Sequence, residues 1–186
     1  MNFEVLANFD WFNEPDNVRF ENNEMVVYAK RGTDFWQSIH HDFKKDNGHF
    51  FFCRRDNDFS IILKWKFDKL EAFSQCGIML RIDERNWFKA SLMNKQENEN
   101  CLSSVLTIAG HSDWCGFELG ENISDIHFKL QRVENDYLLS YSIDGVNFVK
   151  YRSFYLKNFE DVKVGAYIAN PNQDNFSATL AELDIE

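Results

Sequence analysis

The chain of 186 residues is long enough to bury a substantial core, and its 19 phenylalanines supply large apolar side chains for one. Its formal net charge of −10, with basic residues scattered along the chain, makes the phosphate backbone of nucleic acid and anionic membrane surfaces unfavourable partners. We therefore expect a compact protein that binds neither nucleic acid nor membrane.

The first residues contain neither a basic segment nor a continuous apolar run, and no later stretch is long enough to cross a bilayer. This pattern is typical of a cytoplasmic protein. The four cysteines are irregularly spaced and form no C-x-x-C pair, so we expect free thiols rather than zinc ligands or disulfides.

Alternation of apolar and polar residues dominates the chain and is the period of a strand with one buried face. Turn residues separate the alternating segments, most sharply at Glu134–Asp136 and at Asp144-Gly145, which predicts a tight hairpin into residues 146–151. Many short antiparallel strands predict an all-β fold, a two-sheet antiparallel sandwich, in a single domain of residues 1–186. The alternating segments are residues 59–67, 75–82, 86–93, 101–108, 125–133, 136–143, 161–168 and 176–185.

Strand parity suggests a binding face. In residues 75–82 the residues Cys76, Ile78, Leu80 and Ile82 form the apolar set, and in residues 86–93 this set is Phe88, Ala90 and Leu92. The opposite parity then places polar and aromatic side chains together on the other face, away from the core: Gln75, Met79, Arg81, Trp87, Lys89 and Met93. A face that mixes a tryptophan ring with planar polar groups is typical of sugar-binding surfaces.

A series of short motifs runs along nearly the whole chain: Asn13-Glu14-Pro15, Thr33-Asp34-Phe35-Trp36, Asn47-Gly48-His49, Gln75 with Gly77, Trp87 with Lys89-Ala90, Ser112-Asp113-Trp114, Ser142 with Asp144-Gly145, Arg152, and Gly165 before Asn170-Pro171. Together they resemble the DUF1349 family, which includes the regulation-of-enolase proteins of fungi. The resemblance implies a jelly roll of the concanavalin A-like lectin/glucanase type. It implies no particular reaction, because fold does not determine function.

The chain departs from the family pattern in two places. Where the family usually reads W-x-K-A-G-x-E, this chain has Ser91 and Met93 in place of the glycine and the glutamate. After Trp36, a Thr-His-Tyr-Gly-like run is replaced by residues 39–42, which keep His40. An activity that required the glutamate is therefore unexpected here.

In a jelly roll the polar face would be the concave one, and the segments that carry Trp36 and Trp114 could close over it. Simpler roles compete for several of these residues: the tryptophans could pack in the core, Asp113 could cap a turn, and Lys89 and Arg152 could pair with carboxylates. The predicted ligand-binding residues are Trp36, His40, Gln75, Arg81, Trp87, Lys89, Asp113, Trp114 and Arg152.

The sequence gives little support for a metal site, a cofactor site or a catalytic triad. His40 and His41 are adjacent and would point apart in an extended chain, and the sequence has neither a G-x-S-x-G elbow nor a phosphate-binding glycine loop. The carboxylates of residues 182–186 share one strand face, as in some jelly-roll glucanases that resemble this fold, but they lie at the chain end, where strands fray. We expect no metal, no cofactor and no catalytic residue at these positions.

Three hypotheses for the function follow. The preferred one is a non-catalytic carbohydrate-binding or sensing domain that uses the aromatic and polar concave face. A protein-interaction or regulatory module of carbohydrate metabolism would instead need an exposed apolar patch and a cytosolic protein partner. A cryptic sugar-active enzyme would need facing carboxyl groups or an acid paired with a histidine, for which Asp34, Asp113 and His40 are the candidates.

Overall fold

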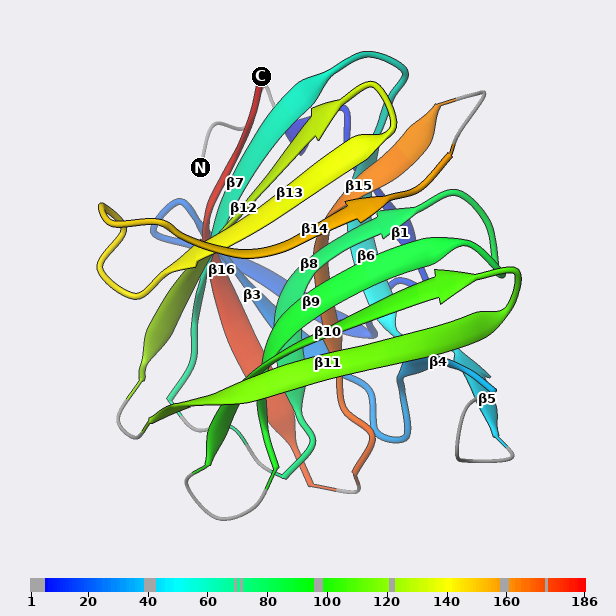
Figure 1. The fold of residues 1–186 in the computed structure, drawn as a ribbon. Coiled ribbons are helices and arrows are strands. Elements are labelled where there is room, and N and C mark those ends of the chain that lie inside the picture. Colours follow the sequence, from blue (N-terminus) through cyan, green and yellow to red (C-terminus); the bar gives the residue numbers. More distant parts are fainter. Residues whose placement is uncertain are drawn as a thin grey trace.

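The computed structural model describes residues 6–38, 43–68, 70, 72–95, 99–120, 123–157, 161–172 and 174–186. These residues form sixteen β-strands, arranged mainly in two layers (Figure 1). The all-β, two-sheet antiparallel jelly-roll prediction is confirmed.

The first sheet has seven antiparallel strands, and the segments 75–82, 86–93, 101–108 and 161–168 provide its centre. In spatial order the strands are β1 (Asp10–Phe12), β6 (His49–Arg55), β15 (Val162–Ala169), β8 (Gln75–Arg81), β9 (Trp87–Asn94), β10 (Asn100–Ile108) and β11 (His111–Gly120). The hairpin from β10 to β11 turns at Ala109 and Gly110, both with positive φ.

The second sheet also has seven antiparallel strands. In spatial order they are β14 (Val149–Tyr155), β13 (Asp136–Ser142), β12 (Asp125–Val133), β7 (Phe59–Lys66), β16 (Phe176–Ile185), β3 (Glu24–Ala29) and β2 (Asn17–Glu21). Both predicted turns are present: Glu134 has a φ of 57° between β12 and β13, and Gly145 has a φ of 74° between β13 and β14.

The main core fills the space between the two sheets. Trp65, Phe88 and Phe128 are fully buried there, with the apolar parity sets predicted for β8 and β9. Trp65 also donates a hydrogen bond from Nε1 to the carbonyl of Gly77, 2.9 Å away, which ties the second sheet to the first. The strand period thus fixes which side chains meet in the core.

A second apolar cluster lies on the outer face of the first sheet, the face turned away from the main core. The short hairpin of β4 (Phe35–Gln37) and β5 (Lys44–Asp46) covers part of this face (Figure 1). Phe35 is completely buried against it, with its ring centroid 6.3 Å from those of both Trp87 and Tyr167. The hairpin therefore divides the outer face into a covered half and an open half.

The four cysteines are free thiols, with Cys53, Cys76 and Cys101 buried and Cys115 exposed. Burial raises the pKa of the Cys53, Cys76 and Cys101 thiols. In the described part of the chain, no helix has the length and apolar character needed to cross a bilayer.

Candidate functional site

A row of small residues crosses the open half of the outer face. Gly77, Ser91, Ser103 and Gly116 occupy directly paired positions on β8, β9, β10 and β11. The neighbouring row carries larger side chains, including Lys89 and Trp114, so the small row forms the floor of a trough. The Oγ atoms of Ser91 and Ser103 lie 3.1 Å apart and share a hydrogen bond along this floor.

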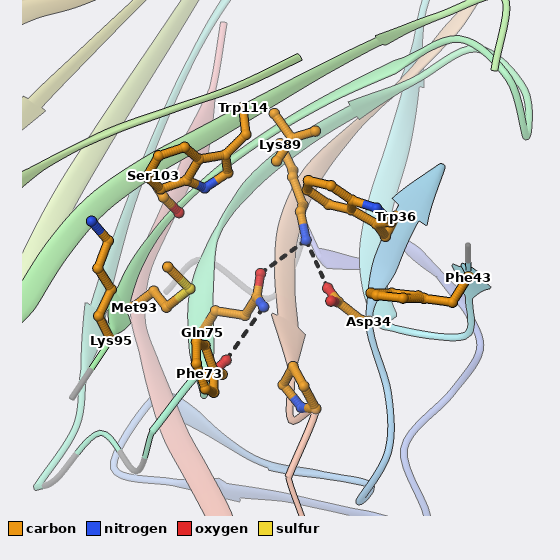
Figure 2. Close-up of a pocket in the computed structure, with 12 residues that line it drawn as sticks. Asp34, Trp36, Phe43, Phe73, Gln75, Lys89, Met93, Lys95, Ser103 and Trp114 are labelled. Carbon is orange, nitrogen blue, oxygen red and sulfur yellow. Dashed lines mark hydrogen bonds and ion pairs between the residues drawn. The ribbon is translucent and has the colours of Figure 1, made fainter. Parts of the chain in front are cut away.

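A pocket of about 800 Å³ lies over this trough (Figure 2). Aromatic and aliphatic side chains form most of its wall, and a few polar groups converge at its base, the usual composition of a small-molecule site. Its lining residues are Asp34, Trp36, Phe43, Phe73, Gln75, Lys89, Met93, Lys95, Ser103, Val105, Trp114 and Pro171.

The polar base of the pocket is a connected network centred on Lys89. Its Nζ donates to Oδ1 of Asp34 at 2.8 Å and to Oε1 of Gln75 at 2.9 Å (Figure 2). The hydroxyl of Tyr167 also donates to Oε1 of Gln75, at 3.0 Å. Burial raises the pKa of Tyr167 well above its ordinary value, so this hydroxyl stays protonated and remains a donor.

Trp114 forms one aromatic wall. A Cβ built on Gly116 would lie 2.7 Å from Cζ2 of Trp114, so the glycine leaves the space that the indole occupies. Nζ of Lys95 lies 5.0 Å from the centre of the indole, within the range of a cation–π contact. The residue as a whole is 43% exposed, so part of it is available to a ligand.

Trp36 forms the opposite wall, and Figure 2 shows its ring and that of Trp114 on either side of Lys89. The β4 strand holds Trp36 in place, because the Gln37 N–H donates to Oγ of Ser112 at 3.1 Å. The Phe43 ring lies 6.3 Å from that of Trp36 and lines the pocket beside it.

Four of the predicted ligand-binding residues therefore line one pocket: Trp36, Gln75, Lys89 and Trp114. The structure does not place Trp87 and Arg81 there, although both lie on the predicted face. Trp87 is fully buried, and its Nε1 donates to the carbonyl of Glu84 at 3.1 Å. The expectation that these two residues face an open groove is corrected, because the β4–β5 hairpin covers them.

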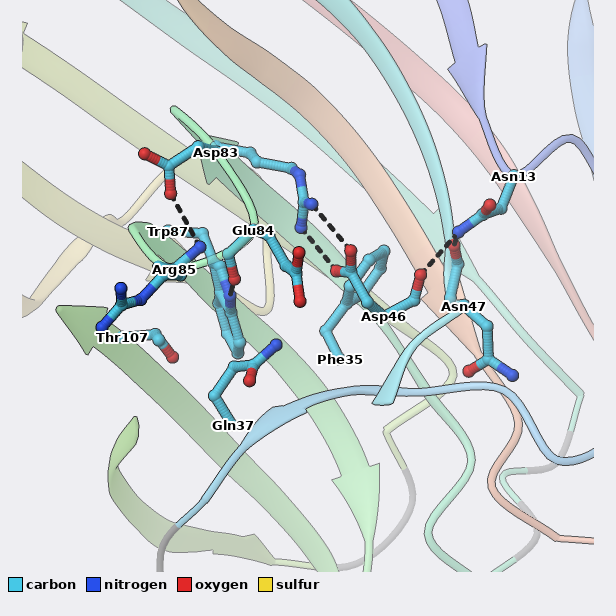
Figure 3. Close-up of polar contacts among 12 residues, drawn as sticks. Asn13, Phe35, Gln37, Asp46, Asn47, Asp83, Glu84, Arg85, Trp87 and Thr107 are labelled. Carbon is cyan, nitrogen blue, oxygen red and sulfur yellow. Dashed lines mark hydrogen bonds and ion pairs between the residues drawn. The ribbon is translucent and has the colours of Figure 1, made fainter. Parts of the chain in front are cut away.

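Arg81 is held by a carboxylate from that hairpin. Its two terminal nitrogens donate to Oδ1 and Oδ2 of Asp46, at 2.6 and 2.8 Å, and Figure 3 labels Asp46 with both bonds dashed. The guanidinium also lies 4.5 Å from the centre of the Phe12 ring. Parity indicated the correct face for Arg81, whereas its burial results from a segment distant in sequence.

Asp113 and Arg152 lie on the opposite side of the first sheet. Ser112-Asp113-Trp114 belongs to β11 rather than to a turn, so Asp113 points away from Trp114. Nη2 of Arg152 donates to Oδ1 of Asp113 at 2.9 Å, and Nη1 donates to Oγ of Ser104 at 3.0 Å. These contacts join β14 of the second sheet to β10 and β11, so placement of Asp113 and Arg152 in the groove is also corrected.

His40 lies outside the described residues, so its predicted place at the groove remains a prediction. His49 is described and buried: its Nε2 accepts the Lys30 N–H at 3.0 Å, and its Nδ1 lies 2.5 Å from the Asn13 carbonyl. Desolvation by burial lowers the pKa of His49. Among the described residues, no three His, Cys, Asp or Glu side chains gather as a metal site would require.

Several pocket residues were not predicted from the sequence. Ser103 and Val105 have the parity of the outer face within β10, so the argument used for β8 and β9 would have found them. Phe43, Phe73, Lys95 and Pro171 reach the pocket from connecting segments, and their sequence contains no comparable signal. Asp34 is the carboxylate among the lining residues, and Lys89 already binds it.

Comparison with known proteins agrees with this architecture. A protein from Saccharomyces cerevisiae named "Regulation of enolase protein 1" is 27% identical over 177 residues, which cover 95% of this chain and 88% of that protein. A crystal structure of a functionally unknown Saccharomyces cerevisiae protein superposes with a TM-score of 0.90 at 26% identity and covers 97% of each chain.

The fold alone is shared with part of a larger enzyme. A xylan beta-1,4-xylosidase from Bacillus halodurans has a TM-score of 0.73 at 12% identity, over 96% of this chain and 39% of that one. The match to a family model is more specific, because it covers residues 11–186 and therefore includes nearly every element described above. The chain belongs to the DUF1349 family of proteins of unknown function.

Proposed function

We propose that the chain is a non-catalytic carbohydrate-binding or sensing module of the cytoplasm, and that its site is the pocket on the outer face of the first sheet. The observation that carries this proposal is the placement of the Trp36 and Trp114 rings on either side of a base of hydrogen-bonding groups (Figure 2). Aromatic rings suit the apolar C–H faces of a sugar, while Gln75, Lys89 and Ser103 suit its hydroxyl groups.

The base of the pocket is preorganised for such a ligand. Lys89 and Gln75 are both about 4% exposed, and their mutual hydrogen bond and the bonds to Asp34 and Tyr167 fix their orientations. A ligand would meet these groups already positioned, which reduces the entropy lost on binding.

The carboxylates favour binding over hydrolysis. Glycosidases commonly use two carboxyl groups that flank the scissile bond. Of the acids put forward as candidates, Asp34 lines the pocket in an ion pair with Lys89, and Asp113 lies on the other side of the sheet.

A screen of glycan binding tests the proposal, with product formation followed in the same samples. Trp36→Ala and Trp114→Ala should each weaken binding at least about tenfold, or 1.4 kcal/mol. Tyr155→Ala is the matched control, because Tyr155 is 57% exposed on β14 and does not line the pocket. The proposal would be contradicted if the wild type bound no glycan, or if Tyr155→Ala weakened glycan binding as much as the two tryptophan variants.

A second candidate function is a protein-interaction module that regulates an enzyme of carbohydrate metabolism. Its support is the exposure of three pocket aromatics, Phe43 at 43%, Phe73 at 48% and Trp114 at 43%, together with the name of the yeast relative. Titration of the protein against purified enolase separates the two candidates. If the protein binds enolase, and if replacing Phe43 and Phe73 abolishes that binding, the interaction module is favoured. If the protein binds glycan but not enolase, the first candidate is favoured.

A further inference from the structure

Three basic residues form a row on the outer face of the first sheet, at a different place from the pocket. Arg54 on β6 is directly paired with Lys163 on β15, and Lys163 is directly paired with Arg81 on β8. Side chains at paired positions of neighbouring strands point to the same face, and like charges placed this way repel one another. Such a row is unexpected in a chain with a net charge of −10.

The two outer members of the row have carboxylate partners. Arg81 is paired with Asp46 through two hydrogen bonds, and Arg54 donates to Oδ2 of Asp161 at 2.8 Å. No ion pair of Lys163 is found among the described residues. The central cation therefore carries the excess positive charge of the row.

Aromatic rings keep Lys163 in this position. Its Nζ lies 5.1 Å from the centre of the Phe52 ring and 5.9 Å from that of Phe12. Partial burial, together with the nearby Arg54 and Arg81, lowers the pKa of Lys163, although the Asp161 carboxylate acts in the opposite direction. An anion bound between these cations would relieve the repulsion and favour the charged ammonium.

A hollow lies beside Arg54, at one end of the row, and neither Lys163 nor Arg81 is among its lining residues. The hollow, of about 320 Å³, includes Phe52 and Arg54 and is also lined by Asn8, Asp10, Cys53 and Arg55. Oδ1 of Asp10, which also lines this hollow, accepts the Trp11 N–H at 2.8 Å. Arg54 has a side chain that is 60% exposed and can reach solvent or a ligand.

We propose that Arg54, Lys163 and Arg81 form a binding site for a small-molecule oxyanion, a phosphate or carboxylate group held mainly by Lys163 and Arg54. The site is independent of the proposed carbohydrate pocket. Arg81 contributes its charge through the shared row, while Asp46 holds its guanidinium in place. Charge-assisted hydrogen bonds from ammonium and guanidinium groups are the usual means of binding such anions.

The test measures binding of inorganic phosphate and, separately, citrate, at a constant ionic strength maintained with sodium chloride. Wild type is compared with Lys163→Met, which keeps the stem of the side chain on the two rings, and with Arg54→Gln. Lys150→Gln is the control, because it removes one positive charge from an exposed position on β14. Titration followed by NMR gives the affinities, and thermal unfolding gives an independent measure through the stabilisation that a bound ligand produces.

The wild type and the control should bind at least one probe with equal affinity, and Lys163→Met should weaken that binding at least tenfold. Phosphate binding alone assigns the site to phosphorylated ligands, citrate binding alone to carboxylates, and binding of both to oxyanions in general. Failure of both probes to bind, or equal binding by Lys163→Met, would overturn the proposal.

Discussion

The covered and open halves of the outer face are built by the same strands yet differ in what they expose. In the covered half, Trp87 and Tyr167 are fully buried beneath Phe35 of the β4–β5 hairpin. In the open half, the small side chains of β9 and β10 leave a pocket bordered by Trp114. Strand parity assigns a side chain to a face, but a segment from elsewhere in the chain decides whether that face meets solvent.

The largest loss of stability should follow removal of the Phe35 ring, which covers part of the outer face. Phe35→Ala should lower the free energy of unfolding by about 3–5 kcal/mol, because it leaves a cavity between Trp87 and Tyr167. Unfolding in urea measures the change. Phe43→Ala is the control: Phe43 is 43% exposed, so its loss should cost far less, and equal costs would show that the hairpin does not seal this half.

Breaking the ion pair between Arg81 and Asp46 should give the next largest loss of stability. Asp46→Ala removes the partner of Arg81, whose side chain is only 5% exposed, and should cost about 3 kcal/mol because a nearly buried charge is left unpaired. Asp16→Ala breaks the exposed pair with Lys30 and should cost less than about 1 kcal/mol. Urea unfolding of both variants would refute the ranking if their losses were equal.

Much of the fold could be predicted from the sequence, because half-buried strands have a period that local residues reveal. β6 was missed because Phe50, Phe51 and Phe52 are buried on both of its faces, so the sequence shows no alternation. β11 was missed for the opposite reason, since it is a sheet edge whose residues are mostly exposed. Very short strands such as β4 contain too few residues to display a period.

The pocket was only partly predictable. Parity correctly placed Gln75 and Lys89, whereas the burial of Trp87 depends on long-range contacts with the hairpin. Asp113 was misplaced because residues 111–120 were not recognised as a strand, in which neighbours point in opposite directions. Met93, which the sequence comparison with the family pattern singled out, lines the pocket.

A third prediction concerns the open half. Gly116→Ala should displace the Trp114 ring, because the added Cβ would lie 2.7 Å from it, and should lower stability by about 1–2 kcal/mol. In a Trp114→Ala background the same change should cost less, and a double-mutant cycle measures this coupling. Purely additive losses would indicate that Gly116 does not position the indole, and that its nearness to Cys101 accounts for the cost instead.

The smallest effect should be a pH dependence that arises where the covering segment leaves β3. His49 accepts the Lys30 N–H there, and burial lowers its pKa below the unfolded value of about 6.5. Its contribution to stability is therefore full above that pH and is lost as the pH falls toward the folded pKa, because the unfolded chain takes up the proton first. The free energy of unfolding should be measured at neutral and at mildly acidic pH. It should change less between the two in His49→Gln than in the wild type. His111→Gln, at an exposed position, is the control, and an identical slope in all three proteins would exclude His49 as its source.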